Sequence, residues 1–136
     1  MQIQYHSKVK REQFFQVIED FIIADINAHS TTPITKLKKG LRFTKKTMGG
    51  QPTLCQIKDY EVNQLLSIEY KNNQIRSLLT YCLSSEEKGT IIDCTSQNFS
   101  LGGKELLPSE REKLVSEKQF QKRLRYIEKF IIKNSK

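Results

Sequence analysis

Four polar side chains of this sequence fall on strand-like segments at positions predicted to face inward. They are one lysine, one threonine and two tyrosines: Lys45, Thr53, Tyr70 and Tyr81. Successive side chains of a strand point to opposite faces, so Tyr70 shares its face with Leu66 and Ile68. A tyrosine offers an apolar ring and one hydroxyl, which suits it to orienting a mostly apolar ligand, but buried tyrosines are also common as core residues. These residues therefore indicate either ligand contact or packing, and Lys45 can also lie at an open rim.

The sequence contains no catalytic or metal-binding motif. His6 falls on the outward face of the first strand-like segment and His29 ends a helical one, so neither belongs to a set of metal ligands. Three cysteines without a paired spacing are interpreted as reduced core residues: Cys55, Cys82 and Cys94. Neither a phosphate-binding loop nor a nucleophile elbow occurs. We therefore expect no metal, no cofactor and no enzymatic activity.

The net charge is positive, and the basic residues are distributed unevenly along the chain. The net charge is +8, and residues 108–136 alone hold nine Lys or Arg against four Glu. A second basic cluster without acids comprises Lys36, Lys38, Lys39, Arg42, Lys45 and Lys46. Binding of nucleic acid or an anionic surface through residues 36–46 and the basic C-terminal segment is thus one hypothesis. A solvated surface is the favoured alternative, because Glu117 and Glu128 interrupt the segment and no nucleic-acid-binding module is recognisable.

Length and hydropathy predict one globular domain over residues 1–136. Hydrophobic residues make up 37% of the chain, which is typical of a folded protein. The most apolar stretch, residues 14–26, contains three acidic residues and is too short to cross a bilayer. The N-terminus lacks the apolar core of a secretory signal, so we expect a cytoplasmic protein without a membrane span.

The first third of the chain changes from a strand pattern to a helical one. Apolar residues alternate with polar ones from Ile3 to Val9, which predicts a strand with one buried face. Apolar residues then recur every three or four positions from Arg11 to about His29, which predicts an amphipathic helix. Thr32-Pro33 resembles a helix start and Gly40 a helix stop, so residues 34–39 are expected to form a short second helix.

Five further strands are predicted, joined by tight turns. The strand-like runs cover residues 41–48, 53–57, 62–70, 75–83 and 90–99. The predicted connections are Gly49-Gly50, a corner at Asp59, Tyr60 and Glu61, Asn72-Asn73, and Glu86 to Gly89. In the last strand the alternation does not decide whether Ile92, Cys94 and Ser96 or Ile91, Asp93 and Thr95 face inward. Because every link is short, the strands should form an antiparallel meander.

The chain closes with a predicted helix from Ser109 to about Asn134. Ser109 and Glu112 have the spacing of a capping box, in which hydroxyl and carboxylate each bind a free backbone N–H. One narrow apolar stripe, predicted to pack on the sheet, comprises Phe120, Leu124, Ile127 and Ile131. Apolar residues off this stripe, such as Leu114, Val115 and Ile132, leave a protein–protein adaptor as a third hypothesis.

This order of elements resembles the α+β helix-grip fold of the START-like superfamily, which includes lipid-transfer domains and polyketide cyclases. The segments that carry the likeness are residues 12–15, residues 37–46 and the basic closing helix. The chain is similar to a small bacterial family of uncharacterised START-like domains. The resemblance implies a hollow between the sheet and the closing helix that holds a small hydrophobic or amphipathic ligand. The expected contacts are Phe43, Lys45, Thr53, Leu66, Ile68, Tyr70, Leu79, Tyr81, Leu124 and Ile127.

Overall fold

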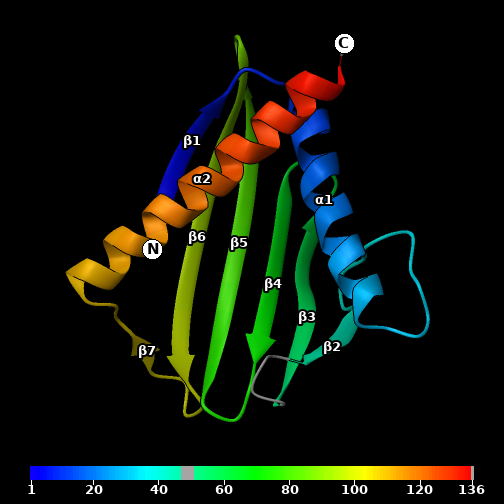
Figure 1. The fold of residues 1–136 in the computed structure, drawn as a ribbon. Helices are drawn as coiled ribbons and strands as arrows, with labels where there is room; N and C mark the ends of the chain where they lie inside the picture. Colours follow the sequence, from blue (N-terminus) through cyan, green and yellow to red (C-terminus); the bar gives the residue numbers. More distant parts are fainter. Residues whose placement is uncertain (47–50, 136) are drawn as a thin grey trace.

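The computed structural model describes residues 1–46 and 51–135 as an α+β structure, in which a curved antiparallel sheet holds a long C-terminal helix (Figure 1). The elements are β1 (Gln2–Ser7), α1 (Arg11–Ala28), β2 (Arg42–Lys46), β3 (Pro52–Glu61), β4 (Leu65–Lys71), β5 (Ile75–Glu86), β6 (Gly89–Ser100), β7 (Glu105–Leu106) and α2 (Glu110–Asn134). The predicted helix-grip fold class is confirmed.

The strands lie in the order β1-β6-β5-β4-β3-β2, and all pairs are antiparallel. Strands β2 to β6 therefore form the predicted meander, while β1 adds to the far side of β6. The short strand β7 extends the sheet beside the end of β6 and was not predicted from the sequence. Ile92 and Cys94 are fully buried whereas Ile91 and Asp93 are only half-buried, which decides the inward face of β6.

The connection from β3 to β4 differs from the prediction. Strand β3 continues through the predicted corner to Glu61, because a register shift between Ile57 and Asp59 bends the strand without ending it. Val62, predicted to begin a strand, lies instead in the turn and is 61% exposed. Asn63 takes the left-handed conformation there, with φ of 66°. The turn thus lies later in the chain than the composition suggested.

Two other predicted turns have different outcomes. The turn after β4 is confirmed, but its cause is a side chain: the Asn72 Oδ1 atom accepts hydrogen bonds from the backbone N–H groups of Gln74 and Ile75, at 2.8 and 2.9 Å. The predicted turn at Gly49-Gly50 lies outside the described residues.

The prediction of a short helix at residues 34–39 is wrong, because the segment between α1 and β2 is irregular. The Asn27 side chain holds the backbone of Ile34 on both sides, donating to its carbonyl at 2.9 Å and accepting from its N–H at 2.8 Å. Leu37 is buried, and the N–H of Gly40 donates to the carbonyl of Ile57 at 2.8 Å. These tertiary contacts outweigh the weak helical preference of the segment, since so short a helix gains little from cooperative hydrogen bonding.

Helix α2 packs its predicted stripe on the concave face of the sheet (Figure 1). Leu124, Ile127 and Ile131 are buried, and Phe120 is half-buried against the same core. At its start, the Ser109 hydroxyl accepts from the Glu112 N–H at 3.2 Å as predicted. The Glu112 carboxylate accepts from the Ser109 hydroxyl at 2.9 Å, whereas the prediction assigned it to the backbone.

Helix α1 lies beside α2 over the β2–β3 end of the sheet (Figure 1). One side of it contacts β3, where the Phe15 ring packs edge-on to the Tyr60 ring at 5.8 Å and the buried Glu19 carboxylate accepts a hydrogen bond from the Tyr60 hydroxyl. A second side of α1 faces α2, where the ring centroids of Phe21 and Phe130 lie 5.8 Å apart. The two helices and the sheet therefore surround a common space.

Candidate ligand-binding cleft

A cleft of about 320 Å³ lies where the concave sheet face, α1 and α2 meet. Its floor and walls combine apolar side chains with five polar ones. The lining residues are Ile18, Phe21, Ile22, Asp25, Lys45, Ile68, Tyr70, Leu79, Tyr81, Arg123 and Ile127. Ile18, Ile68 and Ile127 are buried, so the floor belongs to the core, while Phe21 and Arg123 are exposed at the mouth.

Six of the ten residues expected to contact a ligand line this cleft. They are Lys45, Ile68, Tyr70, Leu79, Tyr81 and Ile127. The structure places the other four elsewhere in the same layer: Leu66 and Leu124 are fully buried core residues, and Phe43 and Thr53 are half-buried outside the lining. Strand alternation predicted the faces of Phe43, Thr53 and Leu66 correctly, but it does not distinguish filled from open positions along the sheet.

The remaining five lining residues were not anticipated as contacts. Four belong to α1, namely Ile18, Phe21, Ile22 and Asp25, because the helix closes one side of the cleft that was assigned to the sheet and the last helix alone. The fifth is Arg123 of α2. Its spacing offered a signal, since it follows Phe120 by three positions and precedes Ile127 by four, which places it beside the apolar stripe.

Lys45 and Asp25 join β2 to α1 across the cleft. The Lys45 Nζ atom lies 2.7 Å from Asp25 Oδ2, and the His29 Nε2 atom lies 3.8 Å from Asp25 Oδ1. Both Lys45 and Asp25 are partly exposed, so the pair contributes little net stability. Its main effect is to neutralise the lysine within the cleft.

The two tyrosine hydroxyls remain neutral at physiological pH. Burial raises the pKa of Tyr70, with further increases from Cys55, Tyr81 and Asp25. Burial also raises the pKa of Tyr81, and nearby Arg123 partly offsets that increase. A neutral phenol both donates and accepts a hydrogen bond, so each tyrosine can orient a polar group of a bound molecule.

The cysteines do not have the properties of nucleophiles. Cys55 and Cys94 are buried as expected, and burial raises the pKa of Cys55 to about 11 and that of Cys94 to about 12. Cys82 was expected in the core but is exposed, because it points to the convex face opposite Tyr81 and Leu83. Partial burial of its thiol nevertheless raises its pKa. The thiols thus remain protonated at neutral pH.

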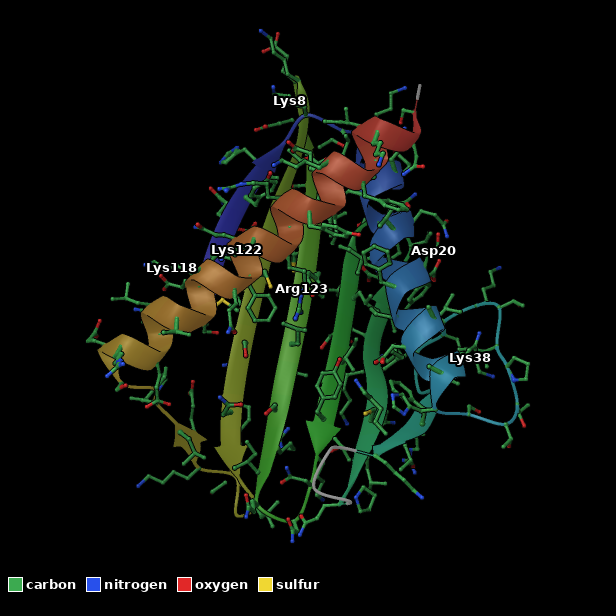
Figure 2. The ribbon with its side chains drawn as sticks, viewed as in Figure 1. Lys8, Asp20, Lys38, Lys118, Lys122 and Arg123 are labelled. Carbon is green, nitrogen blue, oxygen red and sulfur yellow. The ribbon has the colours of Figure 1, made fainter. Side chains whose placement is uncertain are left out.

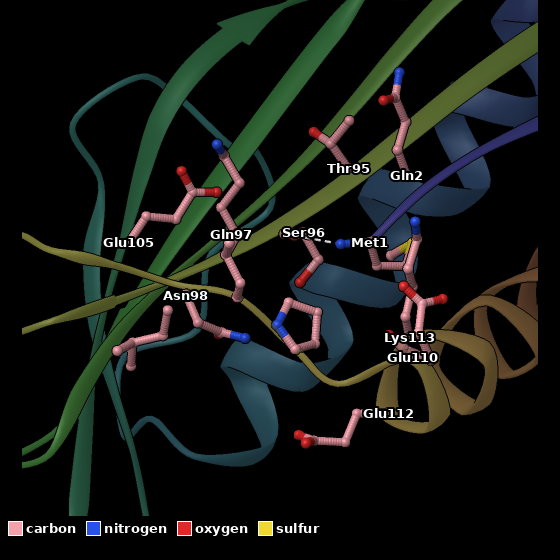
Figure 3. A pocket seen from close by; sticks show the side chains of 14 residues that line it. Met1, Gln2, Thr95, Ser96, Gln97, Asn98, Glu105, Glu110, Glu112 and Lys113 are labelled. Atoms are coloured by element: carbon pink, nitrogen blue, oxygen red, sulfur yellow. Dashed lines mark hydrogen bonds between the residues drawn. The ribbon is translucent and has the colours of Figure 1, made fainter.

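A larger hollow of about 750 Å³ lies along the edge of β6 between its β1 and β7 pairings, beside the first turns of α2 (Figure 3). The Met1 amino group donates to the Ser96 carbonyl there at 3.0 Å. None of its lining residues is buried, and many are Gln, Asn, Glu or Ser. It is a polar groove without buried apolar residues in its lining, whereas the smaller cleft has a buried apolar floor, so the smaller cleft is the candidate site.

The described residues contain neither a metal site nor a spanning helix. Within residues 1–46 and 51–135, no three His, Cys, Asp or Glu side chains lie close enough together to hold a metal ion. Neither α1 nor α2 is long and apolar enough to cross a membrane.

Solved structures of low sequence identity share this fold. Protein MLL2253 from Mesorhizobium loti is 14% identical, with 100% of this chain and 98% of that one covered and a TM-score of 0.66. Ara h 8.0201 is 16% identical, with 98% and 97% covered and a TM-score of 0.63. CalU16 from Micromonospora echinospora is 18% identical, with 96% and 73% covered and a TM-score of 0.59. These likenesses support the START-like fold.

No curated protein matches the sequence. A family model does: the domain of unknown function DUF3284 matches residues 1–98, which contain β1, α1 and the sheet up to β6. Helix α2 lies beyond the matched residues. The chain therefore belongs to the DUF3284 family and has a START-like fold.

Proposed function

We propose that this protein is a non-catalytic binding domain for a small, partly hydrophobic molecule held in the cleft between the sheet, α1 and α2. The observation that carries the proposal is the cleft itself, whose volume of about 320 Å³ falls within the range of about 300–1,000 Å³ typical of ligand sites. Fold alone does not assign function, so the proposal rests on the lining residues.

The composition of the lining accounts for both affinity and orientation. Phe21, Ile22 and Leu79 are not fully buried, so a ligand that covers them removes apolar surface from water, worth roughly 25 cal/mol per Å². Tyr70 and Tyr81 supply hydroxyls at fixed positions on neighbouring strands, which favour one orientation of the molecule.

The absence of catalysis is part of the proposal. The buried thiols are protonated, the tyrosines are neutral, and Asp25 is paired with Lys45. Nucleophilic catalysis requires a nucleophile next to a general base, and no two described side chains of the cleft form such a pair.

Binding of nucleic acid or an anionic surface is the main rival. Lys118 and Lys122 are exposed on α2 (Figure 2). Glu128 of the same helix accepts from the Lys8 N–H at 3.2 Å, so acidic groups interrupt the basic surface. A steep decrease of DNA or RNA affinity with salt would favour the rival. An adaptor role for Leu114, Val115 and Ile132, which are exposed, stays a prediction.

A Leu79→Trp variant tests the proposed function. Leu79 lines the cleft, and the larger indole would fill it, so small apolar compounds that raise the melting temperature of the natural protein should no longer do so. Leu78→Trp is the matched control, because Leu78 is also half-buried but points to the convex face. Thermal unfolding with a panel of apolar and amphipathic compounds provides the measurement. Equal responses of both variants, or no response of the natural protein, would refute the proposal.

A further inference from the structure

We propose that the molecule bound in the cleft is a monocarboxylate, with an apolar body and a single carboxylate group, and that the guanidinium of Arg123 binds this carboxylate. The inference rests on the proposed function, because it names the chemical class that the cleft takes. Four features support it: the position of Arg123, its lack of an acidic partner among the described residues, the charge balance of the cleft and the neighbouring hydroxyl.

Arg123 lies at the border of the apolar stripe of α2 and is the basic residue of this helix in the lining of the cleft. It lies between Phe120 and Ile127 along the helix and lines the cleft (Figure 2). Its guanidinium carbon lies 4.7 Å from the centroid of the Phe120 ring. Stacking on an aromatic face fixes the plane of the guanidinium and directs its N–H groups outward at the edge, where one of them faces the Tyr81 hydroxyl. The group is thus oriented in advance for a planar anion.

The charge of the cleft is unbalanced by one positive unit. Two cations and one carboxylate line it, Lys45, Arg123 and Asp25. Asp25 pairs with Lys45 at 2.7 Å, whereas no carboxylate among residues 1–46 and 51–135 lies within ion-pair distance of Arg123. A ligand with one negative charge would balance Arg123. A phosphate dianion would place an additional negative charge in the same cleft as Asp25.

The shape of the donors also favours a carboxylate. The fork of a guanidinium donates two parallel hydrogen bonds to the two oxygens of a carboxylate, and such pairs are stronger than neutral hydrogen bonds. The Tyr81 hydroxyl is buried next to Arg123, and Tyr70 lies on the adjacent strand. Beside them, Ile68 and Leu79 form an apolar wall for the rest of the molecule. Polar and apolar portions of the cleft are therefore arranged for an acid with an apolar body.

Two probes of equal ring size separate this inference from the proposed function. 2-Naphthoate carries a carboxylate, and 2-naphthalenemethanol carries a neutral hydroxyl on the same apolar body. Isothermal titration calorimetry should give about tenfold tighter binding of 2-naphthoate to the natural protein, because only the anion forms the paired, charge-assisted contact. Arg123→Gln should weaken 2-naphthoate binding about tenfold and remove most of the preference for 2-naphthoate over 2-naphthalenemethanol.

The adjacent Lys122→Gln variant is the matched control, since it removes the same charge from an exposed residue that does not line the cleft. It should leave both affinities unchanged. Far-UV circular dichroism and thermal unfolding of both variants check that Arg123→Gln is folded. Equal affinities of the natural protein for both probes, or equal losses in the Arg123→Gln and Lys122→Gln variants, would overturn the carboxylate inference while the proposed function stands. Binding of neither probe would overturn both.

Discussion

The buried carboxylate of Glu19 is stabilised by a hydrogen bond from one hydroxyl group. Glu19 is 7% exposed, and it accepts from the Tyr60 hydroxyl. Tyr60→Phe removes that donor and leaves a buried acceptor unsatisfied, so it should lower the free energy of unfolding by about 1–3 kcal/mol. Urea denaturation measures the change. Tyr126→Phe, at a side chain that is 61% exposed, should leave the unfolding midpoint unchanged, and equal midpoints for both variants would contradict the assigned contact.

Residue-level predictions succeeded where a residue's type agreed with its surroundings. Tyr70 and Tyr81 lie on the predicted face, because alternation along a regular strand determines it. Arg123 and Asp25 were missed as lining residues, because a charge beside an apolar stripe is ordinarily assigned to solvent. Whether the cleft beside them is open depends on side chains from several elements, and no single stretch of sequence encodes that packing.

At the scale of elements, the junction of β1 and β6 depends on the small size of Gly89. A Cβ atom at this position would lie 1.9 Å from the Ser7 carbonyl oxygen, which belongs to the backbone of β1 and cannot rotate away. Gly89→Ala should therefore destabilise the protein by about 3 kcal/mol, as measured by chemical denaturation. At Gly102 the nearest neighbour of such an atom is 3.9 Å away, so Gly102→Ala serves as the control. Equal stability of the two variants would contradict this account.

Most elements could be predicted from the sequence because periodicity and burial agree in them. The helices at residues 11–28 and 110–134 and the five-stranded meander follow directly from their apolar repeats. The predicted helix at residues 34–39 failed because Asn27 and Gly40 form hydrogen bonds with groups distant in the sequence, which local propensity does not include. The corner at Asp59 failed for a similar reason, since a bulge within a paired strand has no distinctive composition.

At the scale of the whole molecule, the helices cover only part of the concave face. Helix α2 crosses the sheet from the β1 side to the N-terminal end of α1, and α1 lies on the β2–β3 side (Figure 1). Residues of both helices and of the sheet line the cleft. The DUF3284 match ends before α2, so the helix that contributes Arg123 and Ile127 lies outside the matched residues. The proposed site therefore combines matched residues of the sheet and α1 with residues of the closing helix.

Methyl NMR with 2-naphthalenemethanol tests the central claim, that this cleft admits an apolar molecule, most directly. The methyl groups of Ile68, Leu79 and Ile127 line the cleft, whereas those of Leu106 and Leu107 line the polar groove at the edge of β6. Titration should shift the resonances of the cleft residues and leave those of Leu106 and Leu107 in place. Shifts confined to Leu106 and Leu107, or no shift at any of these residues, would contradict the account.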